Sequence, residues 1–211
     1  MRVMLLGASG LVGGQVLAQL LQDPRCSAVV APGRRPLPVQ HARLHAPVLD
    51  FDALPAAPAW AAVDAVVCAL GSTMAQAGSR EAFRRVDHDY PLAFARLARQ
   101  HGARAFALNS AAGAAADSRF FYNRVKGELE NDLRALGFPS LTWVRPGLIG
   151  GQRSQVRRGE AFALKVLGVL GPVLPRRWRI NPAPVIAAAL VQAALEPPPG
   201  EHGVPSSALV G

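Results

Sequence analysis

The most restrictive feature of this chain is the alternation of short apolar segments with amphipathic ones up to residue 145. Three of the apolar segments have the length of a β-strand: Arg2–Leu6, Ser27–Ala31 and Asp64–Leu70. The last of these is apolar on both faces, which is typical of a central strand in a parallel sheet covered by helices. The alternation therefore predicts an α/β fold of the Rossmann type, with a doubly wound parallel sheet.

The remaining segments extend this pattern. We expect further strands at Pro47–Leu49, Arg104–Ser110 and Leu141–Arg145. We expect helices at Leu11–Leu21, from Ser79 to Gln100 with a kink at Pro91, from Asp117 or Ser118 to Gly137, and at Pro184–Leu195. After Gly147 the alternation gives way to a basic loop (Gly150–Gly159) and an apolar segment (Ala161–Leu170). These boundaries predict a single domain over residues 1–211, with a core at about residues 1–150 and a small C-terminal substrate lobe at about residues 151–211.

A glycine-rich loop follows the first expected strand and precedes an amphipathic segment. It reads Gly7-Ala-Ser9-Gly10-Leu11-Val-Gly13. Gly7 suits a tight turn, Gly10 lets a pyrophosphate approach the backbone, and Gly13 permits close packing of helix against strand. The free N–H groups at the start of a helix also attract phosphate. We therefore expect this loop, with Ser9 and Leu11, to bind a dinucleotide; it is not a P-loop, because no Gly-Lys-Ser/Thr follows.

The end of the second expected strand indicates which dinucleotide is preferred. A site for NAD carries an Asp or Glu there, which binds the ribose 2′-hydroxyl. This chain has Ala31-Pro-Gly-Arg34-Arg35 instead, and two guanidinium groups can clamp a 2′-phosphate. We therefore expect NADP(H) in preference to NAD(H), the alternative being a solvated loop of biased composition. Asp50, after the third expected strand, is placed either to contact the adenine amino group or to form a turn.

A second motif places two titratable side chains on one helix face. Tyr122 and Lys126 are four residues apart, and Ser110 lies twelve residues before Tyr122, at the end of an expected strand. Doubly wound sheets bind their ligands at that carboxyl edge. An ammonium beside a phenol lowers the pKa of the phenol, which suits a proton donor and acceptor. We expect Ser110, Tyr122 and Lys126 to be catalytic; the alternative is the chance occurrence of a short pattern.

Composition argues against several other classes of protein. The histidines show no metal-ligand spacing with cysteines or carboxylates, so we expect no metal site. Of the 23 basic residues only Lys126 and Lys165 are lysines, and the arginines are scattered, which favours compositional bias over nucleic-acid binding. No apolar run reaches the about 18–20 residues of a membrane helix, and the glycines within Val3–Gly14 argue against a secretory signal. Two cysteines, Cys26 and Cys68, suit a reducing cytosol, with Cys68 as a buried hydrophobe.

On these residues the chain resembles the short-chain dehydrogenase/reductase superfamily, in its atypical or extended branch. Within that branch it is most similar to the Tat-interacting-protein-like NAD(P)-binding oxidoreductases. The resemblance rests on Gly7–Gly13, on Cys68–Thr73 continuing through Ala77-Gly78 to Val86–Tyr90, on Phe121–Glu128 and on Arg145–Gly147. It implies that Ser110 polarises a carbonyl or hydroxyl, that Tyr122 is the general acid/base and that Lys126 holds the nicotinamide ribose. It also implies backbone contacts to the cofactor from Cys68, Ala69, Leu70 and Gly71, with Pro146 and Gly147 near the nicotinamide.

The chain departs from this family pattern in two places. Asp87 stands where many relatives carry Asn, which puts a proton relay through that position in doubt. Only 60 residues follow Gly151, too few for the lobe with which extended members bind nucleotide sugars, which argues against a sugar-nucleotide epimerase.

We therefore expect a cytoplasmic, NADP(H)-dependent oxidoreductase that acts on a small carbonyl or alcohol substrate by hydride transfer. The alternative is an NADP(H)-binding redox-sensing regulator or protein-interaction protein with little or no catalysis. The expected partner is the small-molecule substrate. The resemblance leaves a homodimer open, since relatives often dimerise through the helix that carries the tyrosine, but the sequence itself does not decide between monomer and dimer. We expect neither a membrane nor nucleic acid as a partner.

Overall fold

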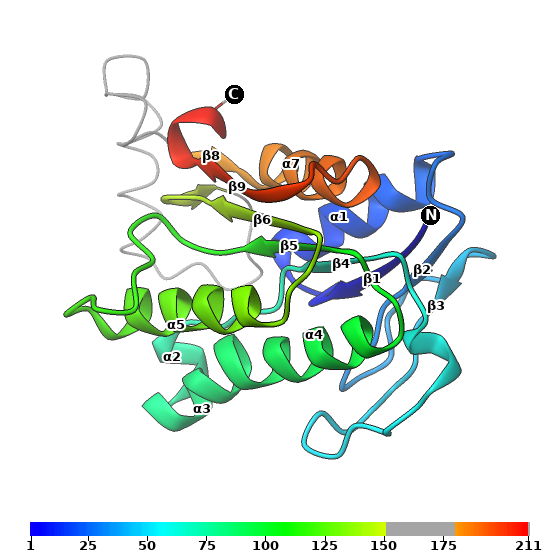
Figure 1. Cartoon of the computed structure of the whole chain (residues 1–211), viewed down its shortest axis with the longest axis horizontal. Helices are drawn as coiled ribbons and strands as arrows, with labels where there is room; N and C mark the ends of the chain where they lie inside the picture. The colour runs from blue at the N-terminus through cyan, green and yellow to red at the C-terminus, as the bar shows by residue number, and fades with distance from the viewer. Residues whose placement is uncertain (151–179, 211) are drawn as a thin grey trace.

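The computed structural model describes residues 1–150 and 180–210, and within them one parallel β-sheet forms the centre of the fold (Figure 1). Its strand order is β3-β2-β1-β4-β5-β6-β9. The strands are β1 (Arg2–Leu6), β2 (Ala28–Val30), β3 (Leu44–His45), β4 (Ala65–Cys68), β5 (Ala105–Asn109), β6 (Ser140–Arg145) and β9 (Gly200–Pro205). The order reverses between β1 and β4, so the chain leaves these neighbouring strands in opposite directions. That is the point where a doubly wound sheet opens a crevice for a ligand, and the expected fold class is confirmed.

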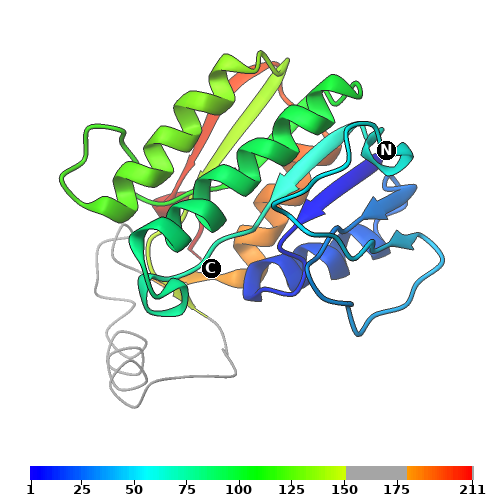
Figure 2. The same cartoon turned by 90° about the horizontal axis from the view of Figure 1, so that it is seen from below.

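Helices cover both faces of the sheet, as Figure 2 shows from below. One face packs against α1 (Leu11–Gln22) and α7 (Ala183–Leu195), and the other against α4 (Tyr90–Gln100) and α5 (Phe121–Ala135). Alternation along β1 divides the core accordingly: Val3 and Leu5 point to the first face, Met4 and Leu6 to the second. All four side chains are fully buried, as expected for a central parallel strand.

The C-terminal residues return to the core. Helix α7 packs beside α1, and β9 pairs with β6 in parallel along its whole length. The core is therefore not limited to residues 1–150, as the sequence suggested, because α7 and β9 complete one helix layer and one sheet edge. A small pair, β7 (Ile149–Gly150) with β8 (Asn181–Pro182), joins the two described parts of the chain. The expected basic loop at residues 150–159 and apolar segment at residues 161–170 lie almost entirely outside the described residues.

Two element boundaries differ from expectation. The third strand lies at β3 rather than at residues 47–49, where Val48 makes only a single bridge to Gly33. The helix expected from Ser79 to Gln100 is divided into α3 (Arg80–Arg84), a π-helical turn η2 (Arg85–Asp89) and α4. It follows α2 (Met74–Ala77), a single turn that begins with a capping box between Thr73 and Gln76. The division occurs just before Pro91, which has no N–H to donate in a regular helical ladder.

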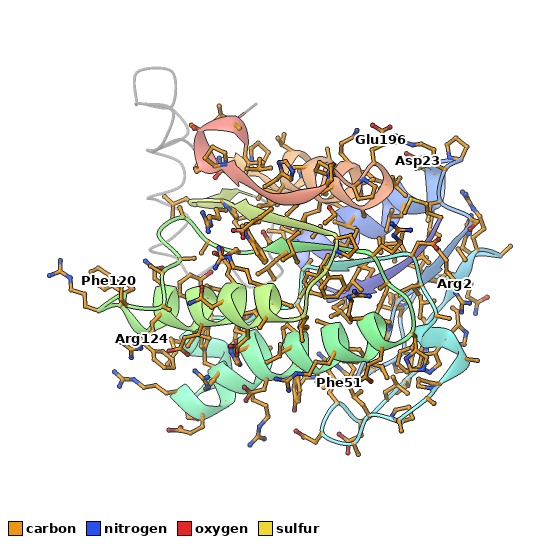
Figure 3. The ribbon with its side chains drawn as sticks, in the orientation of Figure 1. Arg2, Asp23, Phe51, Phe120, Arg124 and Glu196 are labelled. Carbon is orange, nitrogen blue, oxygen red and sulfur yellow. The ribbon has the colours of Figure 1, made fainter. Side chains whose placement is uncertain are left out.

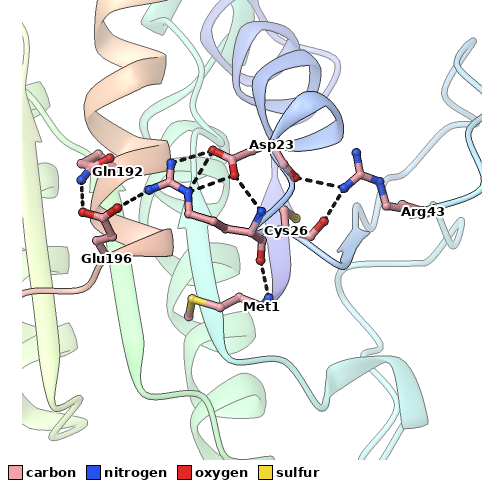
Figure 4. A network of polar contacts seen from close by, with 7 residues as sticks. Met1, Asp23, Cys26, Arg43, Gln192 and Glu196 are labelled. Atoms are coloured by element: carbon pink, nitrogen blue, oxygen red, sulfur yellow. Dashed lines mark hydrogen bonds and ion pairs between the residues drawn. The ribbon is translucent and has the colours of Figure 1, made fainter.

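Arginine side chains tie the ends of the first helix layer together (Figure 4). Arg43 donates to the carbonyl oxygens of Asp23 and Cys26, at 3.0 and 2.6 Å, and to that of Leu21. These oxygens lie in the last turn of α1 or just after it, where no further turn of helix supplies backbone N–H donors. Arg25 joins Asp23 to Glu196, so the last turns of α1 and α7 are held side by side.

The two cysteines are buried and unpaired. Burial raises the pKa of Cys68 to about 11, which agrees with its expected role as a small hydrophobic residue rather than a nucleophile. Among residues 1–150 and 180–210, no helix combines the length and the apolar character that a membrane crossing demands.

Candidate active site

The glycine loop is shaped by two backbone contacts at the carboxyl end of β1. Gly7 has a φ of +83°, and a Cβ there would lie 2.6 Å from the backbone nitrogen of Leu70. A Cβ on Gly13 would lie 2.0 Å from the carbonyl oxygen of Gly7. No other residue fits at either position. Helix α1 begins at Leu11 with Gly10 as its N-cap, and no side chain caps it, so its first N–H groups are available to a phosphate. This cradle fits the pyrophosphate of a dinucleotide.

A first pocket, of about 290 Å³, adjoins this loop on the side of β2. Its walls come from two segments and two single residues: Gly7–Ser9, Ala31–Leu37, Phe51 and Leu70. The Arg34 guanidinium lies 6.0 Å from the centre of the Phe51 ring. Neither Arg34 nor Arg35 forms an ion pair with a carboxylate of the described residues. An adenosine with a 2′-phosphate fits this combination of flat apolar wall and free guanidinium groups.

Asp50 does not line this pocket. Its side chain accepts the backbone N–H of Asp52 at 2.9 Å, the pattern of an Asx turn. The structure thus places Asp50 in the turn that was the alternative to an adenine contact. Phe51, which sequence reasoning did not select, provides the wall instead, and it is held there by edge-on packing against Tyr90 and Phe94.

A second pocket, of about 120 Å³, brings Ser110, Tyr122 and Lys126 together at the carboxyl edge of the sheet. Ser110 follows β5, while Tyr122 and Lys126 come from the first two turns of α5. The opposite wall is formed by Gly10–Val12 and by the loop after β4, Ala69–Thr73. Ser110 and Lys126 are 3% exposed, whereas Tyr122 is 40% exposed and so accessible to a small molecule. Ser110, Tyr122 and Lys126 therefore share one pocket with the glycine loop, which lies about 100 residues earlier in the sequence.

Lys126 is held in this pocket by Asp87. The Lys126 Nζ lies 2.8 Å from Oδ1 of Asp87, and both side chains are almost completely buried. Burial by itself lowers the pKa of Lys126, but the charge of Asp87, supported by Tyr122, more than offsets it, so the pKa of Lys126 is raised. The ammonium thus stays charged at neutral pH although it has little access to water.

Ser110 is engaged on its other side by a buried carboxylate. Its Oγ donates to Oε1 of Glu130 at 2.7 Å, and Glu130 is 2% exposed. Arg145, at the end of β6, binds the same carboxylate through Nε at 2.9 Å and Nη2 at 2.5 Å. This hydrogen bond raises the pKa of Arg145, and the two contacts hold the Glu130 carboxyl group in place. The hydrogen of Ser110 is therefore directed away from the pocket, and its lone pairs are left for a ligand.

A third pocket, of about 430 Å³, shares Ser110 and Tyr122 with the second. The rest of its described wall is apolar or backbone: Ala111, Ala112, Pro146, Gly147, Leu148 and Ile149. Fully buried Asn181 supports this wall, since its Oδ1 accepts the N–H of Gly147 at 2.7 Å and the Oγ–H of Ser206 at 2.8 Å. A substrate in this space would meet Tyr122 and Ser110 directly.

Not every expected residue reaches a pocket. Cys68 is fully buried within β4, and Gly13 packs under Gly7. Glu130 and Asn181 were missed. Glu130 had a signal, because the spacing that pairs Tyr122 with Lys126 reaches it one turn further along α5. Asn181 had none, since its role depends on three loops that meet only in the fold.

The sequence matches known proteins along most of its length. The family model described as NAD(P)H-binding matches residues 7–158. Protein fmp52, mitochondrial, from Aspergillus clavatus is 35% identical over 209 residues, covering 92% of this chain and 87% of that protein. Protein HTATIP2 from Rattus norvegicus is 35% identical over 206 residues, covering 94% and 83%.

The expectation of a cytoplasmic location is wrong on this comparison, because fmp52 relatives at about 35% identity carry a mitochondrial designation in their names. Two unpaired cysteines are compatible with any compartment that keeps thiols reduced, so they could not distinguish the cytosol from other such compartments.

Solved structures agree on the fold. The structure of MoeE5 in complex with UDP-glucose and NAD superimposes with a TM-score of 0.71, at 17% identity, over 96% of this chain and 75% of that one. The Bordetella bronchiseptica enzyme WbmH in complex with NAD+ gives a TM-score of 0.69 at 15% identity, over 96% and 74%. These structures show the shared fold, while the family match and the relatives at 35% identity show that the chain belongs to the NAD(P)H-binding family, together with fmp52 and HTATIP2.

Proposed function

We propose that this protein is an NADP(H)-dependent oxidoreductase that acts on a small, uncharged carbonyl or alcohol. The observation that carries this proposal is the second pocket, in which Ser110, Tyr122 and Lys126 face the glycine loop. A protein that only binds a dinucleotide has no need of an accessible phenol beside a buried ammonium at this place. The apolar wall of the third pocket supports an uncharged substrate.

The proposed preference for NADP(H) rests on the first pocket. No carboxylate lines its described wall. The pocket therefore has no acidic side chain that would bind a ribose 2′-hydroxyl or repel a 2′-phosphate. Arg34 and Arg35 line it instead, and a guanidinium without a carboxylate partner gains most from binding a phosphate.

The residues divide the chemistry as follows. The bound nicotinamide supplies or accepts the hydride. Tyr122 gives a proton to the substrate oxygen in reduction and takes it back in oxidation. Lys126 keeps a positive charge beside the phenol, which stabilises the phenolate formed when the proton leaves. Because Ser110 donates to Glu130, its oxygen accepts a hydrogen bond from the alcohol form of the substrate or from Tyr122.

The first test is ligand-induced stabilisation with NADPH and with NADH, followed by NADPH consumption with a panel of uncharged aldehydes, ketones and quinones. A ligand at one hundred times its Kd stabilises a protein by about 2.7 kcal/mol, a readily measured shift in Tm. We expect a larger shift with NADPH and turnover of at least one carbonyl. Failure of both dinucleotides to bind overturns the proposal. NADPH binding without turnover across the panel favours a regulator instead.

Tyr122→Phe separates chemistry from binding. We expect it to reduce turnover by about 10²- to 10⁴-fold, the usual contribution of a general acid, while the Kd for NADPH changes little. Tyr90→Phe is the matched control, since Tyr90 is the other tyrosine of the chain and its hydroxyl donates to Asp52, outside the proposed reaction centre. Equal activity of Tyr122→Phe and the wild type would remove Tyr122 from the mechanism.

A further inference from the structure

One carboxylate connects the two walls of the second pocket. Oδ1 of Asp87 contacts the Lys126 ammonium on α5 at 2.8 Å. Oδ2 of Asp87 accepts two hydrogen bonds from Ser72, one from the backbone N–H and one from Oγ, both at 2.7 Å. Ser72 belongs to the loop after β4, which together with Gly10–Val12 forms the wall opposite Ser110, Tyr122 and Lys126. A single side chain therefore links helix α5 to this loop.

The chain is built to place this carboxylate. Asp87 lies in the π-helical turn η2, where the wider turn changes the direction of the side chains relative to a regular helix. Gly71 passes close above it: a Cβ at Gly71 would lie 3.0 Å from Oδ1 of Asp87 and 3.6 Å from Nζ of Lys126. A larger residue at position 71 would press on both members of the ion pair.

The charge of Lys126 depends on few neighbours. The titratable groups that face it are Asp87 from η2, Tyr122 from its own helix and Cys68 from β4. Of the three, Asp87 has the largest effect in keeping the ammonium charged, and burial opposes it. Without the Asp87 carboxylate, the buried ammonium would lose its proton at a lower pH.

We propose that Asp87 is a positioning residue of the cofactor site: it clamps Lys126 to the loop Gly71–Thr73 and keeps the ammonium charged where the dinucleotide binds. This inference rests on the proposed function, because it assumes that the second pocket receives the nicotinamide end of NADP(H). It assigns Asp87 a role other than a proton relay, since a carboxylate that is 1% exposed and engaged on both oxygens has no path to water.

The low lysine content makes the ammonium directly observable. Lys126 and Lys165 are the only lysines, so protein labelled with ¹³Cε-lysine gives two signals, and Lys165→Arg assigns that of Lys126. In the wild type we expect the Lys126 signal to show no deprotonation between pH 7 and 9.5 and to shift when NADPH is added. In Asp87→Asn we expect deprotonation within this range. The Kd for NADPH, relative to wild type at the same pH, should then rise by about tenfold or more between pH 7 and 9.5.

The double variant Asp87→Asn/Lys126→Met is the matched control. It buries no isolated charge, so it should fold, and its Kd for NADPH should not depend on pH beyond the wild-type trend. A Kd for Asp87→Asn that differs from wild type by a constant factor at every pH would reduce Asp87 to a structural role and overturn the inference.

If Asp87→Asn does not fold, the Lys126 signal and the Tm of the wild-type protein still test the inference. A wild-type Lys126 signal that titrates below pH 9.5, or that NADPH leaves unchanged although NADPH raises the Tm, overturns the inference and leaves the proposed function standing. Absence of any NADPH- or NADH-induced change in Tm overturns the proposed function, and the inference with it.

Discussion

Ser110 donates its hydroxyl hydrogen to Glu130, with Oγ 2.7 Å from Oε1 and both residues buried. The geometry determines which partner Ser110 can bind. A hydroxyl whose hydrogen is held by a carboxylate cannot donate the same hydrogen to a substrate carbonyl, but it can still accept one. We therefore propose that Ser110 accepts a hydrogen bond from the substrate alcohol or from Tyr122, in place of the expected polarisation of a carbonyl or hydroxyl.

A double-mutant cycle between these two residues measures the strength of that contact. Ser110→Ala and Glu130→Gln each remove the charge-assisted hydrogen bond, so we expect a coupling free energy of about 1–3 kcal/mol from urea unfolding. Glu130→Gln alone should cost more than Ser110→Ala, because it also leaves Arg145 without its carboxylate. The control pair is Ser110→Ala with Glu81→Gln, on the exposed start of α3, where additive effects are expected. Additivity in the Ser110–Glu130 pair would contradict the contact.

The parts of the site that follow from local sequence were predictable. The glycine loop after a strand and the Tyr–Lys pair at helical spacing each consist of a few neighbouring residues, so a local pattern identifies them. The structure brings both into one pocket. Asp87, Glu130 and Asn181 are different, because each acts by joining segments that are distant in the chain. Their buried polar contacts arise only once the sheet and helices have assembled. The helical spacing from Lys126 marks Glu130 in the sequence, but it does not reveal the contact with Ser110.

The fold shows the same division. Strands with a continuous apolar run, such as β1 and β4, were placed within two residues at each end, because burial on both faces leaves a clear signal. Strand β9 was missed: its sequence, Gly-Glu-His-Gly-Val-Pro, has low strand propensity and is mostly exposed, and it forms because β6 offers a free edge. Pairing with β6 in the folded protein therefore outweighs the low strand propensity of this segment.

Gly13 and Gly14 offer a matched test of the glycine loop. A Cβ at Gly13 would lie 2.0 Å from the carbonyl oxygen of Gly7, whereas a Cβ at Gly14 would meet its nearest atom, the carbonyl oxygen of Ala8, at 3.8 Å. We expect Gly13→Ala to lower the Tm and to weaken NADPH binding. Gly14→Ala, inside α1, should raise stability by about 0.5–1 kcal/mol, since alanine is the better helix former. Thermal unfolding with and without NADPH measures both, and equal behaviour of the two variants would rule out the close approach of α1 to Gly7.

The cofactor preference depends on Arg34 and Arg35. Replacing both by alanine should raise the Kd for NADPH by about 10- to 100-fold, the value of one or two charge-assisted hydrogen bonds, and leave the Kd for NADH nearly unchanged. Arg96→Ala, on the exposed side of α4, controls for the loss of positive charge. Isothermal titration with both dinucleotides gives the comparison. A parallel loss of NADPH and NADH affinity would mean that the arginines support the loop rather than read the 2′-phosphate.

Glu201 makes the stability of the sheet edge dependent on pH. The Arg134 guanidinium, against the opposing effect of burial and with the help of the Trp143 N–H, holds the pKa of Glu201 at about 2, below its usual 4.5. A lowered pKa in the folded state contributes stability that is fully present above pH 4.5 and is lost as the pH falls toward 2. The side chain is 42% exposed, so the contribution is about 1 kcal/mol or less.

Glu201→Gln should therefore be less stable than wild type at pH 7, and the difference should shrink between pH 4.5 and 2, where the wild-type carboxyl becomes protonated and loses its advantage over the amide. Urea unfolding at pH 7, 5, 4 and 3 follows the convergence. Asp117→Asn is the control, because Asp117 is exposed and forms no ion pair within the described part of the chain, so its difference from wild type should not vary with pH in this way. A Glu201→Gln difference that stays constant from pH 7 to 3 would show that Arg134 and Trp143 do not favour the charged form, and that β9 is held to β6 by its backbone pairing alone.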